Sequence, residues 1–240
     1  MAGESYNLSR TEEMLNAMID GGSYSTGYIQ SRVEKILQAI IDGTPYTDEP
    51  QSRIEALLIQ ILEGGGGGGG KETLNALIDG SITEIVSDIE TIRKYAFYRL
   101  DNLVSISLPN VKTISQYGIN NCKVLQEVKL PNVTKIEQYG IGSNAILEIL
   151  DLPKVNDLYS GAFGSCSKLA TVILRYNEGV VNLQNYDAFN STLFAANKAG
   201  GKLYVPQARI AAYQAHTQWA RVFNNNPNNQ ILAIENSIYE

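Results

Sequence analysis

The sequence predicts an α+β protein in which short N-terminal amphipathic helices and a glycine linker precede a repeat solenoid with a parallel strand ladder. Three observations predict this arrangement: a helical repeat of 21 to 22 residues before residue 64, a run of seven glycines, and a different 22-residue repeat from residue 89 onward. Repeats of this length bury a face only against their neighbours. We therefore divide the chain into a helical attachment and oligomerisation region (residues 1–63), a linker (residues 64–70) and a repeat domain (residues 71–240).

The composition indicates a soluble chain with a packed core. The chain has 240 residues, of which 44% are hydrophobic and 18% charged, and its net charge is −6. The sequence has no apolar run of about 18 residues, so we expect no membrane insertion, and no secretory signal is visible at its start. Nucleic-acid binding depends on neutralising phosphates with Lys and Arg, so an acidic chain makes nucleic acid an unexpected partner.

The N-terminal region contains three similar segments that begin at Ser9, Ser31 and Ser52. Each starts with Ser-Arg-x-Glu, which is a helix-capping box, and ends with an acidic residue and glycine. Helices of about ten residues are marginal alone in water, so each must pack against another. We leave two interpretations open: a small bundle within the chain, or an assembly element. The aliphatic positions of the second and third copies form a predicted assembly stripe: Val33, Ile36, Leu37, Ile40, Ile54, Leu57, Leu58 and Ile61.

The glycine run from Gly64 to Gly70 separates this region from the second repeat. Glycines pack no side chains and lose much backbone entropy on ordering, so the run indicates a flexible linker. A glycine-lined packing site is the alternative.

The second repeat predicts one short strand in each coil of the solenoid. Leucines recur every 22 residues, and a short stretch with alternating apolar residues follows each one. This alternation predicts parallel strands near residues 105–108, 127–130, 149–152 and 171–174. The expected core contains Leu103, Leu125, Leu147 and Leu169. The outward strand positions are a predicted partner-binding face: Ser105, Ser107, Glu127, Lys129, Ile149, Asp151, Thr171 and Ile173.

The units IRKYAFYRLDNLVSISLP, ISQYGINNCKVLQEVKLP and LYSGAFGSCSKLATVIL resemble BspA-type leucine-rich repeats of bacteria and their phages. The resemblance covers residues 80–240 and implies a leucine-rich-repeat solenoid. It also implies a last strand at Lys202–Pro206, followed by a C-terminal helical cap at Arg209–Trp219. Such repeats serve adhesion and partner binding without a fixed catalytic site.

The N-terminal copies, joined by GTPYTDEPQ, also resemble the N-terminal segments of phage head-fibre and tail-associated proteins. This resemblance implies a virion structural protein whose N-terminal helices bind a capsid or tail protein and associate as a homo-oligomer, most readily a trimer. The repeats would then bind a host-surface protein or glycan. The alternative is a bacterial leucine-rich-repeat adhesin or interaction scaffold, located in the cytoplasm or at the cell surface by non-classical export.

Few residues are suited to catalysis or metal binding. The chain has one histidine, His216, and two cysteines, Cys122 and Cys166, which occupy equivalent positions two repeats apart and are expected in the core. We therefore predict no enzymatic activity, no metal and no cofactor. Tyrosines at one repeat position (Tyr95, Tyr117 and Tyr139) predict a stacked column, either structural or an aromatic contact face for glycans or proteins.

Overall fold

The structure is a computed structural model that describes residues 81–86, 89–194, 200–223, 230–235 and 237–239. The predictions for residues 1–80, including the attachment helices, their assembly stripe and the glycine linker, lie outside these residues. Within the described residues, no helix is both long and apolar enough to cross a membrane.

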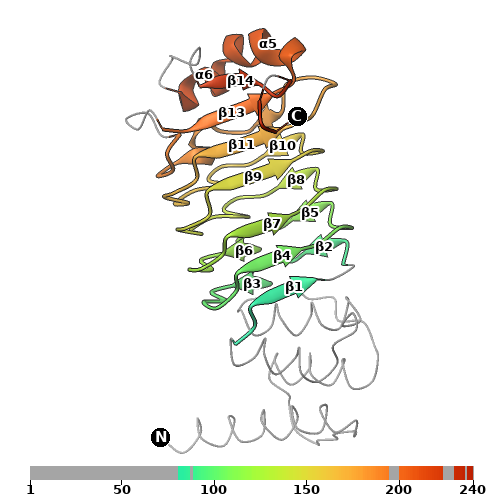
Figure 1. Cartoon of the computed structure of the whole chain (residues 1–240), viewed down its shortest axis with the longest axis vertical. Helices are drawn as coiled ribbons and strands as arrows, with labels where there is room; N and C mark the ends of the chain where they lie inside the picture. Colours follow the sequence, from blue (N-terminus) through green and yellow to red (C-terminus); the bar gives the residue numbers. More distant parts are fainter. Residues whose placement is uncertain (1–80, 87–88, 195–199, 224–229, 236, 240) are drawn as a thin grey trace, which may run out of the picture.

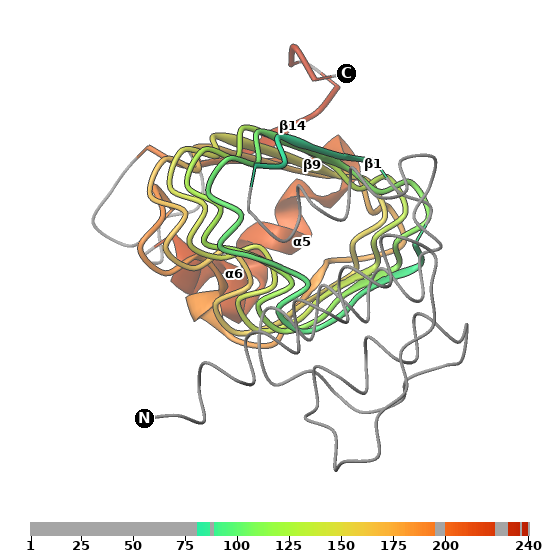
Figure 2. The ribbon, with the colours of Figure 1, turned by 90° about the horizontal axis from the view of Figure 1, so that it is seen from below.

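The described chain forms a parallel β-solenoid closed at its C-terminal end by helices (Figure 1). Seven strands stack along one side of the coils: β1 (Glu84–Val86), β4 (Ser105–Ser107), β7 (Glu127–Lys129), β9 (Ile149–Leu152), β11 (Thr171–Leu174), β13 (Lys202–Val205) and β14 (Ile231–Ala233). A second side carries β2 (Thr91–Ile92), β5 (Thr113–Ile114), β8 (Lys135–Ile136), β10 (Asp157–Leu158) and β12 (Asn182–Leu183), and a third carries β3 (Phe97–Tyr98) and β6 (Ile119–Asn120). The coils superimpose when seen along the solenoid (Figure 2).

The predicted core is confirmed. Leu103, Leu125, Leu147 and Leu169 are all fully buried, and the central residues of the strands beside them also point inward. The strand pairing is parallel and keeps the repeat register, since Ile106 lies opposite Val128 and Leu150 lies opposite Val172. The alternation of side chains along each strand therefore sends one set of residues into the core and the other to the outer face.

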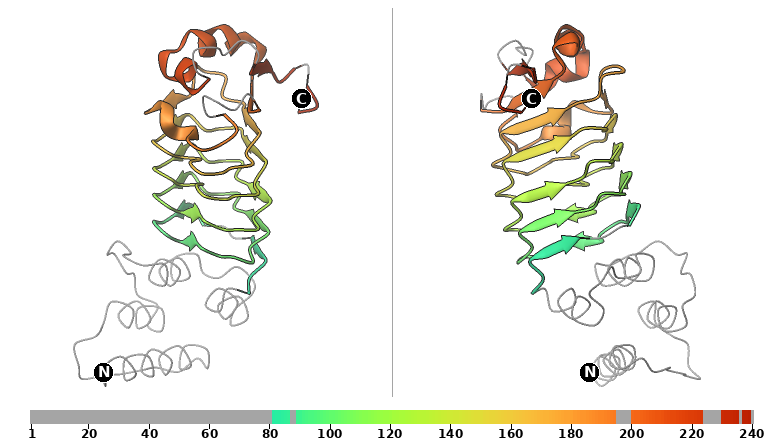
Figure 3. Two further views of the ribbon diagram at one scale, coloured as in Figure 1. Left: turned by 90° about the vertical axis from the view of Figure 1, so that its left-hand side faces the viewer. Right: turned by 45° about the vertical axis from the view of Figure 1, so that its right-hand side comes forward.

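One expectation about the strands needs correction, because the four predicted strands do not form one continuous ladder. They divide between a three-stranded sheet, ordered β1-β4-β7, and a four-stranded sheet, ordered β14-β13-β11-β9. Strands β7 and β9 stack next to one another but are not paired (Figure 3). The second side of the solenoid stays continuous across the same step, since β8 pairs with β10. The break is therefore confined to the outer strand face.

One inward position carries a polar side chain in three successive coils, and its hydrogen bond is made in the same way in each of the three. The thiols of Cys122 and Cys166 are buried and free, and each donates to the carbonyl of the residue 25 positions earlier, at 3.2 and 3.0 Å. Asn144 fills the position between them and donates to the carbonyl of Ile119 at 2.9 Å. The prediction that both cysteines lie in the core is confirmed. Burial raises the pKa of Cys166 to about 12.

The C-terminal end differs from the expectation in two respects. The predicted strand at Lys202–Pro206 is present as β13, but it is not the last strand, because β14 pairs with it. The single helix expected at Arg209–Trp219 is wrong: a short 3₁₀ turn (Gln207–Arg209) leads to α5 (Ile210–Ala215) and α6 (Thr217–Val222), separated by an extended His216. These helices cover the last coil.

Two aromatic side chains fasten this cap to the coil beneath it. The indole N–H of Trp219 donates to the carbonyl of Val181 at 2.9 Å, and the backbone N–H of Val181 donates to the hydroxyl of Tyr213 at 3.0 Å. Both rings are fully buried. Burial raises the pKa of Tyr213 to about 12, so the phenol stays neutral where it accepts this hydrogen bond.

Candidate partner-binding face

Strand alternation places seven of the eight predicted face residues at partly or fully exposed positions on the outer side. In the three-stranded sheet, Ser105 lies opposite Glu127 and Ser107 lies opposite Lys129. In the four-stranded sheet, Ile149 lies opposite Thr171, and Asp151 lies opposite Ile173. The structure thus places the predicted residues on one side of the solenoid, in two groups separated by the break.

The first group forms what we call the open patch: Ser105, Ser107, Glu127 and Lys129. The ammonium of Lys129 lies 2.7 Å from the carboxylate of Glu127, and both side chains are more than half exposed. An ion pair this exposed contributes little to stability. The open patch is therefore a set of polar groups that the fold presents to solvent without needing them for packing.

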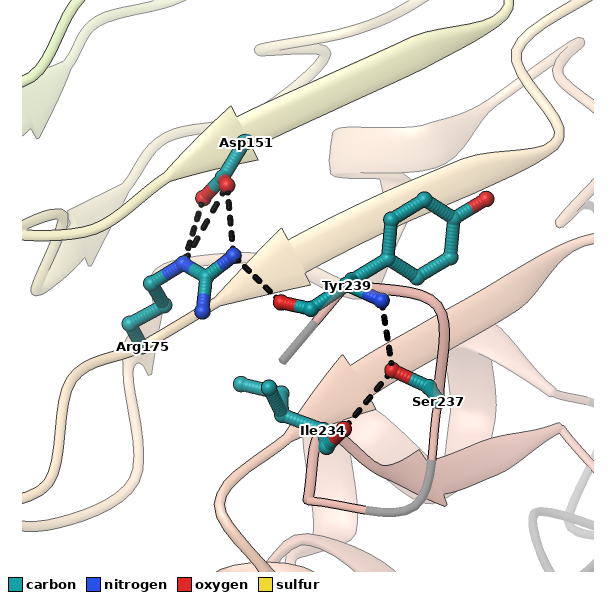
Figure 4. Close-up of polar contacts among 5 residues, drawn as sticks. All are labelled: Asp151, Arg175, Ile234, Ser237 and Tyr239. Carbon is teal, nitrogen blue, oxygen red and sulfur yellow. Dashed lines mark hydrogen bonds and ion pairs between the residues drawn. The ribbon is translucent and has the colours of Figure 1, made fainter.

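The second group differs, because part of it is covered. Here Asp151 and Ile173 lie beside two residues that sequence analysis did not single out, Arg175 and Tyr204. We call these four residues the covered patch. The residues that follow β14, namely 234–235 and 237–239, return across this part of the face, and we call them the closing segment (Figure 4).

Arg175 connects the covered patch to the closing segment. Its guanidinium donates to both carboxylate oxygens of Asp151, at 2.8 to 3.1 Å, and its Nη2 also donates to the carbonyl of Tyr239 at 2.7 Å (Figure 4). The hydrogen bonds to Asp151 raise the pKa of Arg175, which keeps the guanidinium charged. The ring of Tyr239 meets that of Tyr204 edge to face, with the centroids 4.9 Å apart.

The closing segment explains why one predicted face residue is wrong. Ile173 was expected to be exposed, but it is only 2% exposed, whereas Ile149, an outward residue on the neighbouring strand, is 46% exposed. Ile173 still points outward, since Val172 and Leu174 on either side of it belong to the core cluster and Ile173 does not. It lies in register between Asp151 and Tyr204, under the region where the closing segment crosses. Its burial is therefore on the outside of the solenoid.

An open hollow of about 430 Å³ lies at the break between the two sheets. It is lined by Gln126, Ile146, Glu148, Ile149 and Lys168. The lining mixes both charges with aliphatic side chains, and it adjoins the open patch through Gln126, the neighbour of Glu127. The break therefore coincides with a hollow in the outer strand face.

The tyrosine column is confirmed. The rings of Tyr95, Tyr117 and Tyr139 stack with centroids 5.3 and 5.4 Å apart and planes within 4° of parallel. All three adopt left-handed backbone conformations, with φ of 62°, 56° and 54°. Gly161 takes the next equivalent position with φ of 62°, and a Cβ there would lie 2.5 Å from the Tyr139 ring.

This geometry favours the structural interpretation of the column. A left-handed conformation costs about 1–2 kcal/mol for a residue with a side chain. An aromatic pair contributes about 0.5–1.5 kcal/mol, which offsets part of that cost. Because the faces of neighbouring rings stack against each other, little ring surface remains for a sugar to stack against.

The described residues contain no group of three His, Cys, Asp or Glu side chains placed to hold a metal ion.

Comparison with known proteins identifies the repeat. Residues 84–197 match the BspA type leucine-rich repeat region in six copies. These residues are therefore similar to BspA-type leucine-rich repeats. No curated protein matches the chain. The comparisons give no support to the resemblance between the N-terminal copies and phage virion proteins.

Similar solved structures include proteins of three bacteria. A leucine-rich cell surface protein of Faecalibacterium prausnitzii is 18% identical with a TM-score of 0.45, over 58% of this chain and 34% of that one. The pneumococcal vaccine antigen PcpA is 16% identical with a TM-score of 0.45, over 63% and 41%. A leucine-rich repeat protein of Bacteroides ovatus is 19% identical with a TM-score of 0.29, over 52% and 43%. The chain thus spans less than half the length of each.

A signal for Arg175 was present in the repeat. Pro109, Pro131 and Pro153 end their strands at intervals of 22 residues, and Arg175 stands at the next such position. Proline lacks a backbone N–H donor and ends strand pairing. Its replacement by arginine marks the coil in which the outer face is bound by the closing segment. The sequence had no comparable signal for Tyr239, which lies outside the leucine-rich repeats.

Proposed function

We propose that this protein is a non-enzymatic leucine-rich-repeat binding module of the kind found in bacterial surface adhesins and interaction scaffolds. In this proposal, the open patch binds a protein or glycan partner. The leucine-rich repeat supplies a rigid frame, and the outer strand positions supply the contacts. A virion role lacks support from the comparisons, so the proposal is made without it.

The observation that carries this proposal is that each strand buries one set of side chains in the core and presents the other set to solvent. Ile106 and Val128 are buried in the core, while Ser107 and Lys129 beside them are held at fixed spacing on a paired ladder and face solvent. Solenoids use such extended surfaces for binding, because repetition places many contacts in one plane. A rigid face also loses little conformational entropy when it binds.

The chemistry of the open patch favours a polar partner. It offers one ammonium, one carboxylate and two hydroxyl groups, with the adjoining hollow at the break between the sheets. This set suits hydrogen bonding to a glycan or to the polar rim of a protein interface. We expect modest affinity for a single copy.

The test is a binding screen with the full chain and a matched control. Labelled full chain would be applied to an array of bacterial and host glycans and to a panel of purified extracellular proteins. Lys129→Ala should then weaken any binding found by about tenfold, equivalent to about 1.4 kcal/mol. Lys123→Ala is the control, because Lys123 also forms an exposed 2.7 Å ion pair, with Asp101, away from the open patch. Equal effects of the two substitutions would rule out the open patch.

We also propose that residues 1–63 associate the chain into a homo-oligomer through the assembly stripe. Multiple copies would increase the avidity of a weak binding face without any new contact. Sedimentation of the full chain should therefore show an oligomer, and Ile36→Asp with Leu58→Asp should yield a monomer. A monomeric full chain at micromolar concentration would contradict this part of the proposal.

A further inference from the structure

The closing segment occupies the covered patch in the manner of a bound peptide. Tyr239 inserts its ring against Tyr204 and offers its carbonyl to Arg175, while the preceding Ile238 is 91% exposed. The neighbouring residues 238 and 239 thus face the solvent and the surface, respectively. A partner peptide could use the same two contacts, an aromatic ring against Tyr204 and a backbone carbonyl at Arg175.

The surface beneath the closing segment is built independently of it. Within the described residues, Arg175 makes three hydrogen bonds to Asp151 and one to Tyr239. If the segment left, the guanidinium would remain held in the same orientation by the carboxylate. The donor aimed at Tyr239 is therefore preorganised, which lowers the cost of binding a replacement.

The covered patch also contains an apolar side chain on the outer side of the sheet. Ile173 points outward and is buried on the outside of the sheet, next to the ring of Tyr204. Removing the closing segment would expose both side chains to water. An exposed apolar group beside a charged donor is typical of a binding site.

The closing segment is fastened locally as well. The hydroxyl and the N–H of Ser237 both donate to the carbonyl of Ile234, at 2.7 and 2.9 Å, and the N–H of Tyr239 donates to the Ser237 hydroxyl at 3.1 Å (Figure 4). This turn directs Tyr239 back over β13 towards Arg175. Among the described residues, the contacts of Tyr239 with Tyr204 and Arg175 hold the end of the segment to the covered patch.

We propose that the covered patch is a second binding site, which takes a segment of a partner protein bearing an aromatic side chain and which the closing segment occupies until that partner displaces it. This proposal deepens the proposed function, on which it rests, by naming a second surface and the kind of partner that it fits. The partner's aromatic ring replaces Tyr239 against Tyr204, and its backbone carbonyl accepts the hydrogen bond from Arg175. Because the closing segment competes within the same chain, the apparent affinity for the partner equals the intrinsic affinity multiplied by the fraction of time that the segment is undocked.

The test uses a fluorescein-labelled peptide with the sequence AIENSIYE, which corresponds to residues 233–240. Fluorescence anisotropy would measure its binding to the full chain and to the full-length Tyr239→Ala variant. Releasing the resident segment should strengthen peptide binding by about tenfold, equivalent to about 1.4 kcal/mol. Ser237→Ala, which removes the two hydrogen bonds of the hydroxyl and leaves the ring in place, should have the same direction of effect and serves as the second route if Tyr239→Ala does not fold.

Further variants locate the site. In the Tyr239→Ala background, Arg175→Gln should abolish peptide binding, whereas Lys123→Ala, on the far side of the break, should leave it unchanged. An unlabelled peptide in which the tyrosine is replaced by alanine should fail to compete. Equal affinity for the wild type and the released variants, or binding that survives Arg175→Gln, would overturn the proposal. Because this assay reads only the covered patch, failure here is distinguishable from failure of the open patch to bind a glycan or protein.

Discussion

The open patch and the covered patch come from the same repeat positions, yet they have opposite surroundings. Ser107, Lys129, Asp151 and Ile173 occupy equivalent outward positions in four successive coils. The first two face solvent, whereas Asp151 is bound by Arg175 and Ile173 is buried. The repeat therefore determines which way a side chain points, and its neighbours, including the closing segment outside the repeat, determine whether it is accessible.

The largest expected effect tests whether the two sheets share one core. Leu125→Ala and Leu169→Ala remove equivalent, fully buried side chains from coils on either side of the break. Each should lower the free energy of unfolding by about 2–5 kcal/mol, because each leaves a cavity. Urea denaturation would measure both. A loss below about 1 kcal/mol for only one of them would mean that the two halves of the core are not equally packed.

The next prediction compares two isoleucines on the outer face. Ile173→Ala should cost about 2 kcal/mol, the lower end of the range for a buried isoleucine, because its cover can partly collapse into the space. Ile149→Ala should change stability by no more than about 0.5 kcal/mol, as expected for a surface position. Thermal unfolding of both variants checks the pair. Equal costs would show that the closing segment does not bury Ile173 in solution.

Alkaline pH should weaken the described domain through groups near its C-terminal end. Burial raises the pKa of Cys166 from 9.0 to about 12 and that of Tyr213 from 10.0 to about 12. Between pH 9 and 12 the unfolded chain therefore loses these protons first, so the free energy of unfolding falls as the pH rises. Cys166 alone should account for roughly 1 kcal/mol of this loss between pH 8 and pH 10.

Cys166→Ala provides the control for this pH dependence. Denaturant unfolding at pH 8 and pH 10 should show a smaller loss for the variant than for the wild type, although the variant is less stable at both pH values. An unchanged difference between the two pH values would mean that the thiol is not buried as the structure has it.

The smallest effects concern the two ion pairs of the outer face. Double-mutant cycles should give Arg175 and Asp151 a coupling of up to about 1 kcal/mol, since the pair is bidentate but its side chains are 34% and 42% exposed. Lys129 and Glu127 should couple by close to zero, because both side chains are more than half exposed. A stronger coupling for the open pair would contradict its role as a surface free for binding.

Much of the fold followed from the sequence, because a 22-residue period specifies both the core leucines and the strand register. Leu103 to Leu169 and the parallel pairing were predictable from spacing alone. The break between β7 and β9 was not, since the period continues through it without change. The covered patch was only partly predictable: alternation places Arg175 outward, but the contact between Tyr239 and Arg175 joins residues 64 positions apart, outside any periodic pattern.

Thiol modification of Ile149→Cys and Ile173→Cys in the full chain tests most directly whether one part of the outer face is covered and the rest open. The native cysteines are buried and free, so the introduced thiol is the reactive one. Cys at position 149 should be modified rapidly, and Cys at position 173 at least about tenfold more slowly, with Tyr239→Ala restoring the faster rate. Equal rates at the two positions, with no response to Tyr239→Ala, would contradict the division of this face into an open patch and a covered patch.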